Sequence, residues 1–230
     1  PTFSACFLIH PPPYNRHRSR SRDRTSIPQQ GGGSLYRSRN SSRRPRQNSR
    51  SISAYHKAKF PMIRLETPRT LMRDILGNDA GFLLAMMGDA EVMRYYPKVA
   101  DAREVREFID RMRSAYKNDG CGLWLVVDRE SGEPLGRVGL LRQQVNGRDE
   151  FEIGYMIHRP FWRRGLATEA ALAVRDYAFA ERRLRRVISL IRPDNLPSQG
   201  VARKLAMDIV GSWDHGGLAH HIFAVESPAA

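Results

Sequence analysis

The chain has 230 residues, of which 41% are hydrophobic, and this length allows one or two globular domains. Its formal charge of +14 is uneven, because residues 1–61 hold 13 Lys/Arg against one acid (+12), whereas residues 62–230 hold 25 against 23 (+2). The nearly neutral body excludes a general attraction for nucleic acid, and only two cysteines, Cys6 and Cys121, make a disulfide framework a poor explanation of the fold.

Residues 1–61 form a tail rich in Ser, Arg, Pro and Gly, which cannot bury enough apolar surface to offset its ordering entropy, so we expect it to be disordered. Three interpretations stay open. The first is that the tail is sequence outside the natural protein, as Met62 directly before the first strand-like run suggests. The second is an organelle transit peptide, and the third is an RNA- or acid-binding arm. The remaining 62–226 are predicted to form one domain.

The first part of this domain is predicted to contain one strand and three helices. Proline interrupts the strand, and Asn or Asp side chains are expected to cap two of the helices. The elements are a strand over 63–65 and 70–73 broken at Pro68, helices over 82–87 (capped by Asn78) and 90–95 (capped by Asp89), and an amphipathic helix over 103–116.

The second part is predicted to be richer in strands. Turn signals at 131–132 and 146–147 indicate an antiparallel meander of three strands. A long helix then leads to another buried strand, and this order predicts a parallel, right-handed crossover. The elements are strands over 123–128, 135–143 and 150–157, a helix over 166–182, a strand over 187–191, a helix over 197–205, and strands over 209–213 and 221–225. The fold class is α+β, with a single mixed, mostly antiparallel sheet flanked by helices.

The loop Trp-Arg-Arg-Gly-Leu-Ala-Thr at 162–168 opens the long helix. A helix N-terminus offers unpaired N–H groups and a positive dipole end, which suit phosphate. Gly165 and Ala167 let the backbone approach an oxygen, Arg163 and Arg164 add charge, and Thr168 adds a hydroxyl. The loop is neither a P-loop nor a three-glycine dinucleotide fingerprint, and alone it equally fits an ordinary strand-to-helix connection with two exposed arginines.

The surrounding residues resemble the GNAT acetyltransferase superfamily, and within it the branch of the RimJ and RimL ribosomal-protein acetyltransferases. The resemblance covers essentially all of 62–226. Four pieces match in order: 66–71, 89–93, 152–155 running through 162–170, and 195–198 running through 204–205.

This resemblance implies that acetyl-CoA lies in a wedge between the strand ending at Ile157 and the strand over 187–191. The pantetheine arm would pair with backbone groups of one strand and with an asparagine side chain, and the pyrophosphate would lie on the loop. The residues implied are Tyr155, Met156 and Ile157 for the arm, Asn195 for the pantetheine, and Arg163, Arg164, Gly165, Leu166, Ala167 and Thr168 for the pyrophosphate.

Two side chains are the candidates for catalysis. The superfamily often uses a tyrosine as general acid, but no tyrosine follows Tyr177, so Ser198 is the available hydroxyl for the departing thiolate. Glu152, on the same strand face as Gly154 and Met156, is the candidate general base. The alternatives are hydrogen bonding at a helix N-terminus for Ser198 and a cross-strand charge pair for Glu152.

The predicted function is transfer of an acetyl group from acetyl-CoA to a primary amine by direct attack, without a covalent enzyme intermediate. The acceptor is a protein N-terminus or a small-molecule amine; a non-catalytic acyl-CoA-binding module on the same fold is the alternative. We expect no metal. We also expect no membrane partner, since the longest apolar run (82–87) is far below the ~20 residues of a spanning helix. Nucleic acid is expected only through the tail, the location is expected to be cytoplasmic, and a homodimer is left open.

Overall fold

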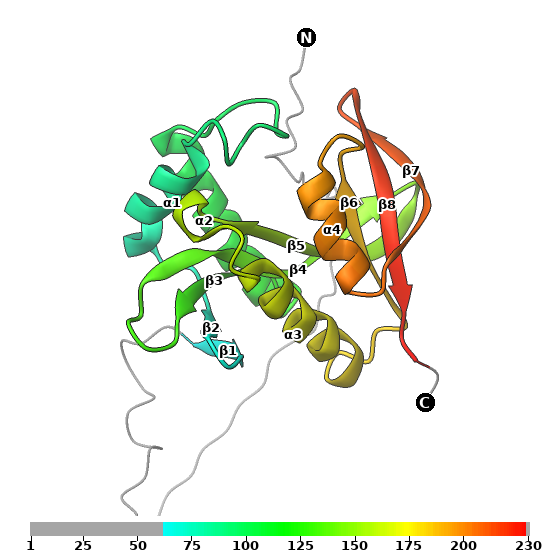
Figure 1. The fold of residues 1–230 in the computed structure, drawn as a ribbon, viewed down its shortest axis with the longest axis horizontal. Helices are drawn as coiled ribbons and strands as arrows, with labels where there is room; N and C mark the ends of the chain where they lie inside the picture. Colours follow the sequence, from blue (N-terminus) through cyan, green and yellow to red (C-terminus); the bar gives the residue numbers. More distant parts are fainter. Residues whose placement is uncertain (1–61, 229–230) are drawn as a thin grey trace, which may run out of the picture. The chain divides into compact units, whose positions relative to one another are not determined.

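The structure is a computed structural model that describes residues 62–228. The tail at 1–61, including Cys6, lies outside the described residues. One eight-stranded sheet, in the order β1-β2-β3-β4-β5-β6-β8-β7, organises this part of the chain (Figure 1). Its strands are β1 (Ile63–Glu66), β2 (Thr70–Arg73), β3 (Leu123–Asp128), β4 (Pro134–Val145), β5 (Arg148–Ile157), β6 (Arg186–Ile191), β7 (Asp208–His215) and β8 (Leu218–Glu226).

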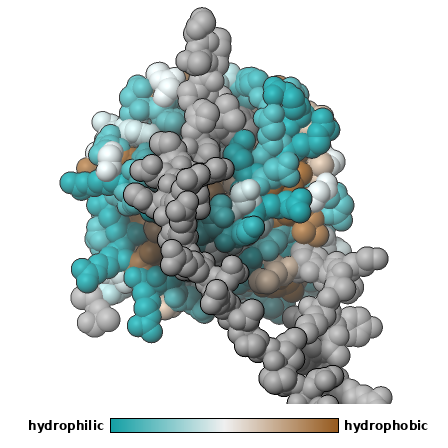
Figure 2. Space-filling model, turned by 180° about the vertical axis from the view of Figure 1, so that it is seen from behind, coloured by the Kyte–Doolittle hydropathy of each residue, from teal (hydrophilic) through white to brown (hydrophobic). Residues whose placement is uncertain are grey.

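Helices cover both faces of the sheet and divide the core in two. They are α1 (Ala80–Met87), α2 (Ala102–Asn118), α3 (Leu166–Ala180) and α4 (Leu196–Lys204). Figure 1 shows α3 crossing in front of β4 and β5, and α3 and α4 share a buried cluster with side chains such as Ile153. The other face packs against α1 and α2 around Leu125 and Met156. From behind, the described surface is largely hydrophilic with small hydrophobic patches (Figure 2).

The predicted α+β class and the crossover are confirmed. All neighbouring strands pair antiparallel except β5 and β6, which pair in parallel at Glu152 and Ile188. The meander β3-β4-β5 forms as predicted, and Asn146 and Gly147 take the positive φ values of 49° and 76° that a tight hairpin requires.

The first predicted strand is wrong, because Pro68 marks a reversal and not a break. β1 and β2 pair antiparallel as a hairpin, closed by a hydrogen bond from Thr67 N to Thr70 O of 2.8 Å. Proline lacks an N–H donor and fixes φ, so it serves as well at a turn as at an interruption. The turn of this hairpin reaches α3, where Arg69 contacts Glu169.

Two predicted helix starts are also wrong. The residue that precedes α1 is Asp79 and not Asn78, and its carboxylate accepts hydrogen bonds from Arg73 Nη2 (2.7 Å) and Leu76 N (2.7 Å). The segment 90–95 forms turns and no helix. Asp89 bonds the backbone of Glu91, two residues ahead, which closes a local turn and competes with helix formation.

Candidate functional site

A wedge opens between β5 and β6. Their parallel pairing is recorded only at Glu152 and Ile188, and Ser189 Oγ then donates to Ile153 O at 2.8 Å. Beyond this point Tyr155 and Ile157 continue β5 with no β6 residue paired to them in the described register. The strands therefore separate toward their C-terminal ends, where an extended ligand can hydrogen-bond the free side of β5 as an added strand would.

The register with β4 decides which backbone groups face the wedge. His158 N donates to Leu135 O at 2.8 Å, so by the antiparallel alternation Met156 directs its backbone groups to Arg137 of β4. Tyr155 and Ile157 direct theirs the other way. Trp162 Nε1 already donates to Ile157 O at 2.6 Å. Of the three backbone ligands expected from the sequence, Tyr155 thus has the most open groups, whereas Met156 turns away from the wedge.

The loop after β5 presents its backbone to solvent at the start of α3. Arg163 and Gly165 both have positive φ, 62° and 76°, and Gly165 is the N-cap, with no side chain capping the helix. The helical bonding begins with Glu169 N to Gly165 O at 3.0 Å. The N–H groups of the first turn therefore lack intrahelical partners, and alternating backbone conformations of this kind gather N–H groups around an anion.

The two arginines of the loop differ in what they contact. Arg164 Nη2 donates to Pro160 O at 3.3 Å, and its guanidinium lies over the Phe161 ring at 5.4 Å. Arg163 is exposed and makes no ion pair within residues 62–228. Both charges lie beside the first turn of α3, so the loop combines backbone donors with two cationic side chains and can hold a diphosphate.

The turn of the β1–β2 hairpin clamps this loop, a contact that the sequence did not predict. Arg69 Nε donates to Glu169 Oε2 at 2.6 Å, and Arg69 Nη1 donates to Arg164 O at 2.9 Å. Thr67 Oγ1 also donates to Glu169, at 2.7 Å. Burial opposes ionisation of Glu169, but these hydrogen bonds outweigh it and lower the pKa of its carboxyl. The motif at 66–71 held the sequence signal for this contact, since it combines a turn with an arginine.

The start of α4 forms the opposite wall. Asn195 Oδ1 accepts from Ser198 N at 3.1 Å, so Asn195 and not Ser198 caps the helix. Ser198 O accepts from Tyr155 Oη at 2.7 Å, which joins α4 to β5 across the wedge, and burial raises the pKa of this phenol. Ser198 therefore takes part in the hydrogen bonding of this helix N-terminus through its backbone N–H, and the cap does not use its hydroxyl.

Glu152 lies where β5 and β6 begin to separate, on the face of the sheet that carries α1 and α2. Gln143 Nε2 donates to its Oε2 at 2.6 Å, and the Leu190 backbone N–H also bonds the carboxyl. Burial raises the pKa of Glu152, and these bonds together with the charge of Arg137 offset part of that rise. The hydrogen-bonded cross-strand partner, Gln143, is neutral, but the charge of Arg137 on β4 also acts on this carboxyl, so the charge-pair alternative stays a prediction. A carboxyl with a raised pKa suits a general base.

A buried arginine completes the electrostatics of this face. Arg137 is 8% exposed, its Nε has no hydrogen-bond partner in the described part of the chain, and its guanidinium lies 4.6 Å from the centroid of the Phe108 ring. Burial lowers the pKa of Arg137. This guanidinium, held against an aromatic ring in the core, is a fixed positive charge near Glu152. It favours the ionised form of the Glu152 carboxyl.

Within residues 62–228, no group of three or more His, Cys, Asp or Glu side chains is placed to hold a metal ion. No helix in this part of the chain has the length and apolar character needed to cross a membrane.

Residues 69–208 match the family model described as an acetyltransferase (GNAT) domain, so the chain belongs to the GNAT acetyltransferase family. The uncharacterised protein YkkB of Bacillus subtilis (strain 168) is 37% identical over 145 residues, 63% of this chain and 84% of that protein. A GNAT-family acetyltransferase from Bacillus anthracis is 26% identical with a TM-score of 0.61, covering 72% of this chain and 98% of that one.

RimL, a ribosomal L7/L12 α-N-protein acetyltransferase solved in complex with coenzyme A, shares the fold at 17% identity, with a TM-score of 0.60 over 72% of this chain and 98% of that one. The predicted GNAT family is thus confirmed. Membership of the RimJ/RimL branch in particular stays a prediction.

Proposed function

We propose that the protein transfers an acetyl group from acetyl-CoA to a primary amine. The observation that carries this is the opened β5–β6 wedge leading to an uncapped helix N-terminus, where Gly165 has φ 76°. The free edge of β5 suits the pantetheine arm, and the first turn of α3 suits the pyrophosphate. Arg163, Arg164 and the backbone of 165–168 would hold the phosphates, and the Asn195 amide would hold the arm. Because Oδ1 of Asn195 already accepts the capping hydrogen bond from Ser198 N, the side-chain nitrogen of Asn195 is the group left to donate to the pantetheine arm.

In the proposed reaction, the lone pair of the amine attacks the thioester carbonyl carbon, the C–S bond breaks, and the thiolate leaves. Glu152, directly or through a water, takes the proton that the amine loses. The Ser198 hydroxyl stabilises the thiolate by donating a hydrogen bond to it. Because a thiol pKa is about 8.5, the thiolate is a tolerable leaving group without full protonation.

An α-amine is the class of acceptor that this site supports best. A lysine amine with a pKa of about 10.4 is almost wholly protonated at neutral pH, whereas an α-amine near 7.8 is neutral in roughly one molecule in seven. A single buried carboxyl such as Glu152 is therefore sufficient base for an α-amine. RimL, which shares the fold, is described as acting on a protein α-amine, which supports a protein or peptide N-terminus as the acceptor class; a small-molecule amine is the second class.

The test is thiol release from acetyl-CoA by the full chain, assayed against peptides with free N-termini, amino acids, polyamines and aminoglycosides. We expect turnover with at least one α-amine and none with the same peptide acetylated at its N-terminus. Acetyl-CoA binding without turnover across the whole panel would support the non-catalytic alternative. Failure to bind acetyl-CoA would contradict both. The cytoplasmic location and the homodimer remain predictions from the sequence.

A further inference from the structure

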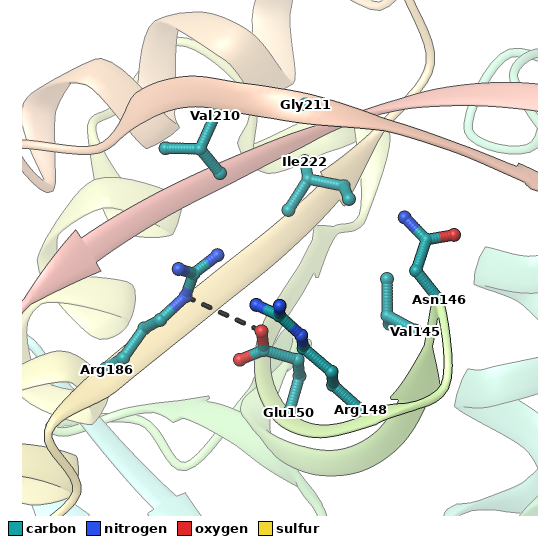
Figure 3. A pocket seen from close by; sticks show the side chains of 8 residues that line it. All are labelled: Val145, Asn146, Arg148, Glu150, Arg186, Val210, Gly211 and Ile222. Atoms are coloured by element: carbon teal, nitrogen blue, oxygen red, sulfur yellow. Dashed lines mark ion pairs between the residues drawn. The ribbon is translucent and has the colours of Figure 1, made fainter.

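A cavity of about 330 Å³ lies on the same face of the sheet as Glu152, beyond the region that α1 and α2 cover. The β4–β5 hairpin forms one wall, and the edge strand β7 forms the other (Figure 3). Ile222 of β8 contributes to the floor, over a small buried cluster that includes Ile188. The site is therefore a trough with an apolar bottom, open to solvent.

The curvature of the sheet builds this trough from strands that are not neighbours. Asn146 Nδ2, at the tip of the β4–β5 hairpin, donates to Ser212 O of β7 at 3.3 Å. The β7–β8 register shifts between Ile209 and Gly211, which leaves Val210 as a bulge residue that lines the cavity. The hydrogen bond and the bulge together hold β7 toward the hairpin, so the cavity belongs to the folded architecture and does not depend on one side-chain position.

Two guanidinium groups turn toward the cavity, and they are poorly satisfied (Figure 3). Arg186 forms two long ion pairs, with Glu150 at 3.6 Å and Glu226 at 3.5 Å, and its buried Nε has no hydrogen-bond partner among residues 62–228. Arg148 is exposed and makes no ion pair within the described part of the chain. The cavity wall thus offers two cations and the carboxylate of Glu150, while Glu226 pairs with Arg186 from outside the lining. Because both pairs of Arg186 are long and Arg148 is exposed, guanidinium donors are left for an oxygen ligand.

The cavity lies close to the proposed reaction centre. Glu150, in its wall, is two residues before Glu152 on the same face of β5. Arg186 is likewise two residues before Ile188, the parallel partner of Glu152. At roughly 3.3 Å per residue along a strand, Arg186 is about 7 Å from the level of Glu152. An amine at Glu152 could therefore place a group two to three extended residues away in the cavity.

We propose that this cavity binds a carboxylate of the amine acceptor, held between Arg186 and Arg148, so that the preferred acceptors carry an anionic group about 7 to 10 Å from their amine. This inference rests on the proposed function. The carboxylate has two sources of the same chemistry: the C-terminus of a short free peptide, or an acidic side chain near the N-terminus of a protein.

The experiment compares three acceptors with the full chain: Ala-Ala-Ala as the free acid, its C-terminal amide, and Ala-Ala-Glu as the amide. We expect kcat/KM for the free acid to exceed that of its amide by roughly tenfold, as a charge-assisted hydrogen bond would give. Recovery of activity with Ala-Ala-Glu amide would show that an acidic side chain serves as well; no recovery would assign the site to free peptides.

Variants of the cavity residues test whether the two arginines cause the preference for the free acid over the amide. Arg148→Gln, at an exposed and unpaired position, and Arg186→Gln should each bring the acid-to-amide ratio close to one while leaving KM for acetyl-CoA unchanged. Arg142→Gln is the matched control, because Arg142 lies on the same hairpin, opposite Phe151, and pairs with Asp149 outside the cavity. Equal rates for acid and amide in the unaltered protein, or a preference that survives in Arg148→Gln and Arg186→Gln, would overturn the proposal.

Calorimetry of the binding of the same peptides in the presence of coenzyme A separates the carboxylate-binding role of the cavity from the proposed acetyl transfer. Binding of the acid over the amide without any acetylation would mean that the proposed function fails and the cavity assignment stands. Acetylation of both with equal efficiency would mean the reverse.

Discussion

The two sides of β5 offer a ligand different kinds of groups. On the side of α3, the groups offered are backbone atoms: the free edge of Tyr155, and the first-turn N–H groups that follow Gly165. On the side of α1 and α2, they are side chains: Glu152 with its partner Gln143, the buried Arg137, and the arginines of the cavity.

This difference determines what substitution can change. A backbone donor cannot be removed by exchanging one side chain, so the α3 side is sensitive to conformation and depends on glycine and small residues. The acceptor side depends on particular charges, and one substitution there can alter the chemistry or the choice of acceptor without disturbing the fold. On the proposed assignment, the same scaffold could keep one acyl donor and change its acceptor.

The largest effect should follow from Glu152→Gln. Loss of a general base typically costs about a hundredfold or more in kcat, and the affinity for acetyl-CoA should stay unchanged because Glu152 lies on the acceptor side. Since burial raises the pKa of Glu152, the acid limb of the kcat/KM profile should lie above the usual pH range of a glutamate, with activity rising as the carboxyl ionises. That limb should vanish in the variant. Asp149→Asn, on the same strand but exposed and facing away, is the control.

An intermediate effect is expected for Gly165→Ala, which tests the backbone side. A residue with a Cβ at φ 76° is strained by about 1–2 kcal/mol, which corresponds to roughly tenfold in KM for acetyl-CoA if the loop relaxes away from its binding conformation. Gly132→Ala is a matched control, because Gly132 has φ 73° in a remote turn with open space around it. Both variants should melt earlier, and only the first should bind acetyl-CoA less tightly. Equal acetyl-CoA affinity in the two would contradict the role of the loop.

A smaller effect should follow from Glu169→Gln, which weakens the clamp without touching the ligand. Because Arg69 is half-exposed, the expected loss is about 1 kcal/mol, or fivefold in KM for acetyl-CoA with kcat preserved. The lowered pKa of Glu169 means that its stabilisation is present above the unfolded-state pKa and is lost as pH falls through the folded value. The melting temperatures of the two proteins should therefore converge at acidic pH. Arg103→Leu, which breaks an exposed pair on α2, should change neither quantity.

The smallest effect is expected for Ser198→Ala. The contacts that Ser198 makes to Asn195 and Tyr155 use its backbone, so the variant should keep the stability of the protein. If the hydroxyl stabilises the thiolate, kcat should fall a few-fold with acetyl-CoA, while equilibrium binding of acetyl-CoA is unchanged. Asn195→Ala, by contrast, removes the cap and should cost about 1 kcal/mol of stability. An unaltered kcat in Ser198→Ala would remove the serine from the mechanism.

Local patterns predicted well the elements that form the wedge and its loop. The turn signals at 131–132 and 146–147 and the small residues after Trp162 are each readable over a few positions, and the expected strands and helix form around them. Pro68 misled because a proline serves equally at a break and at a turn. The direction of the Met156 backbone depends on pairing parity, which a one-residue change of register reverses.

Long-range features could not be predicted in this way. Arg69 and Glu169 are 100 positions apart, and nothing in either segment alone names the other. The cavity arises from sheet curvature and the bulge at Val210, which bring β7 to a hairpin that is not its neighbour in the sheet. The burial of Arg137 likewise depends on how α2 crosses the sheet.

The hairpin clamp also has a consequence for the order in which the protein matures. Arg69 leaves the ribosome 100 residues ahead of Glu169, so the turn that braces the loop must wait for nearly the whole of the sheet centre to be synthesised. Contacts this distant along the chain are closed late and slowly, because the entropy of the intervening loop opposes them. Coenzyme binding should therefore be among the last properties that a nascent chain acquires, and truncated chains should fold their meander before they can retain acetyl-CoA.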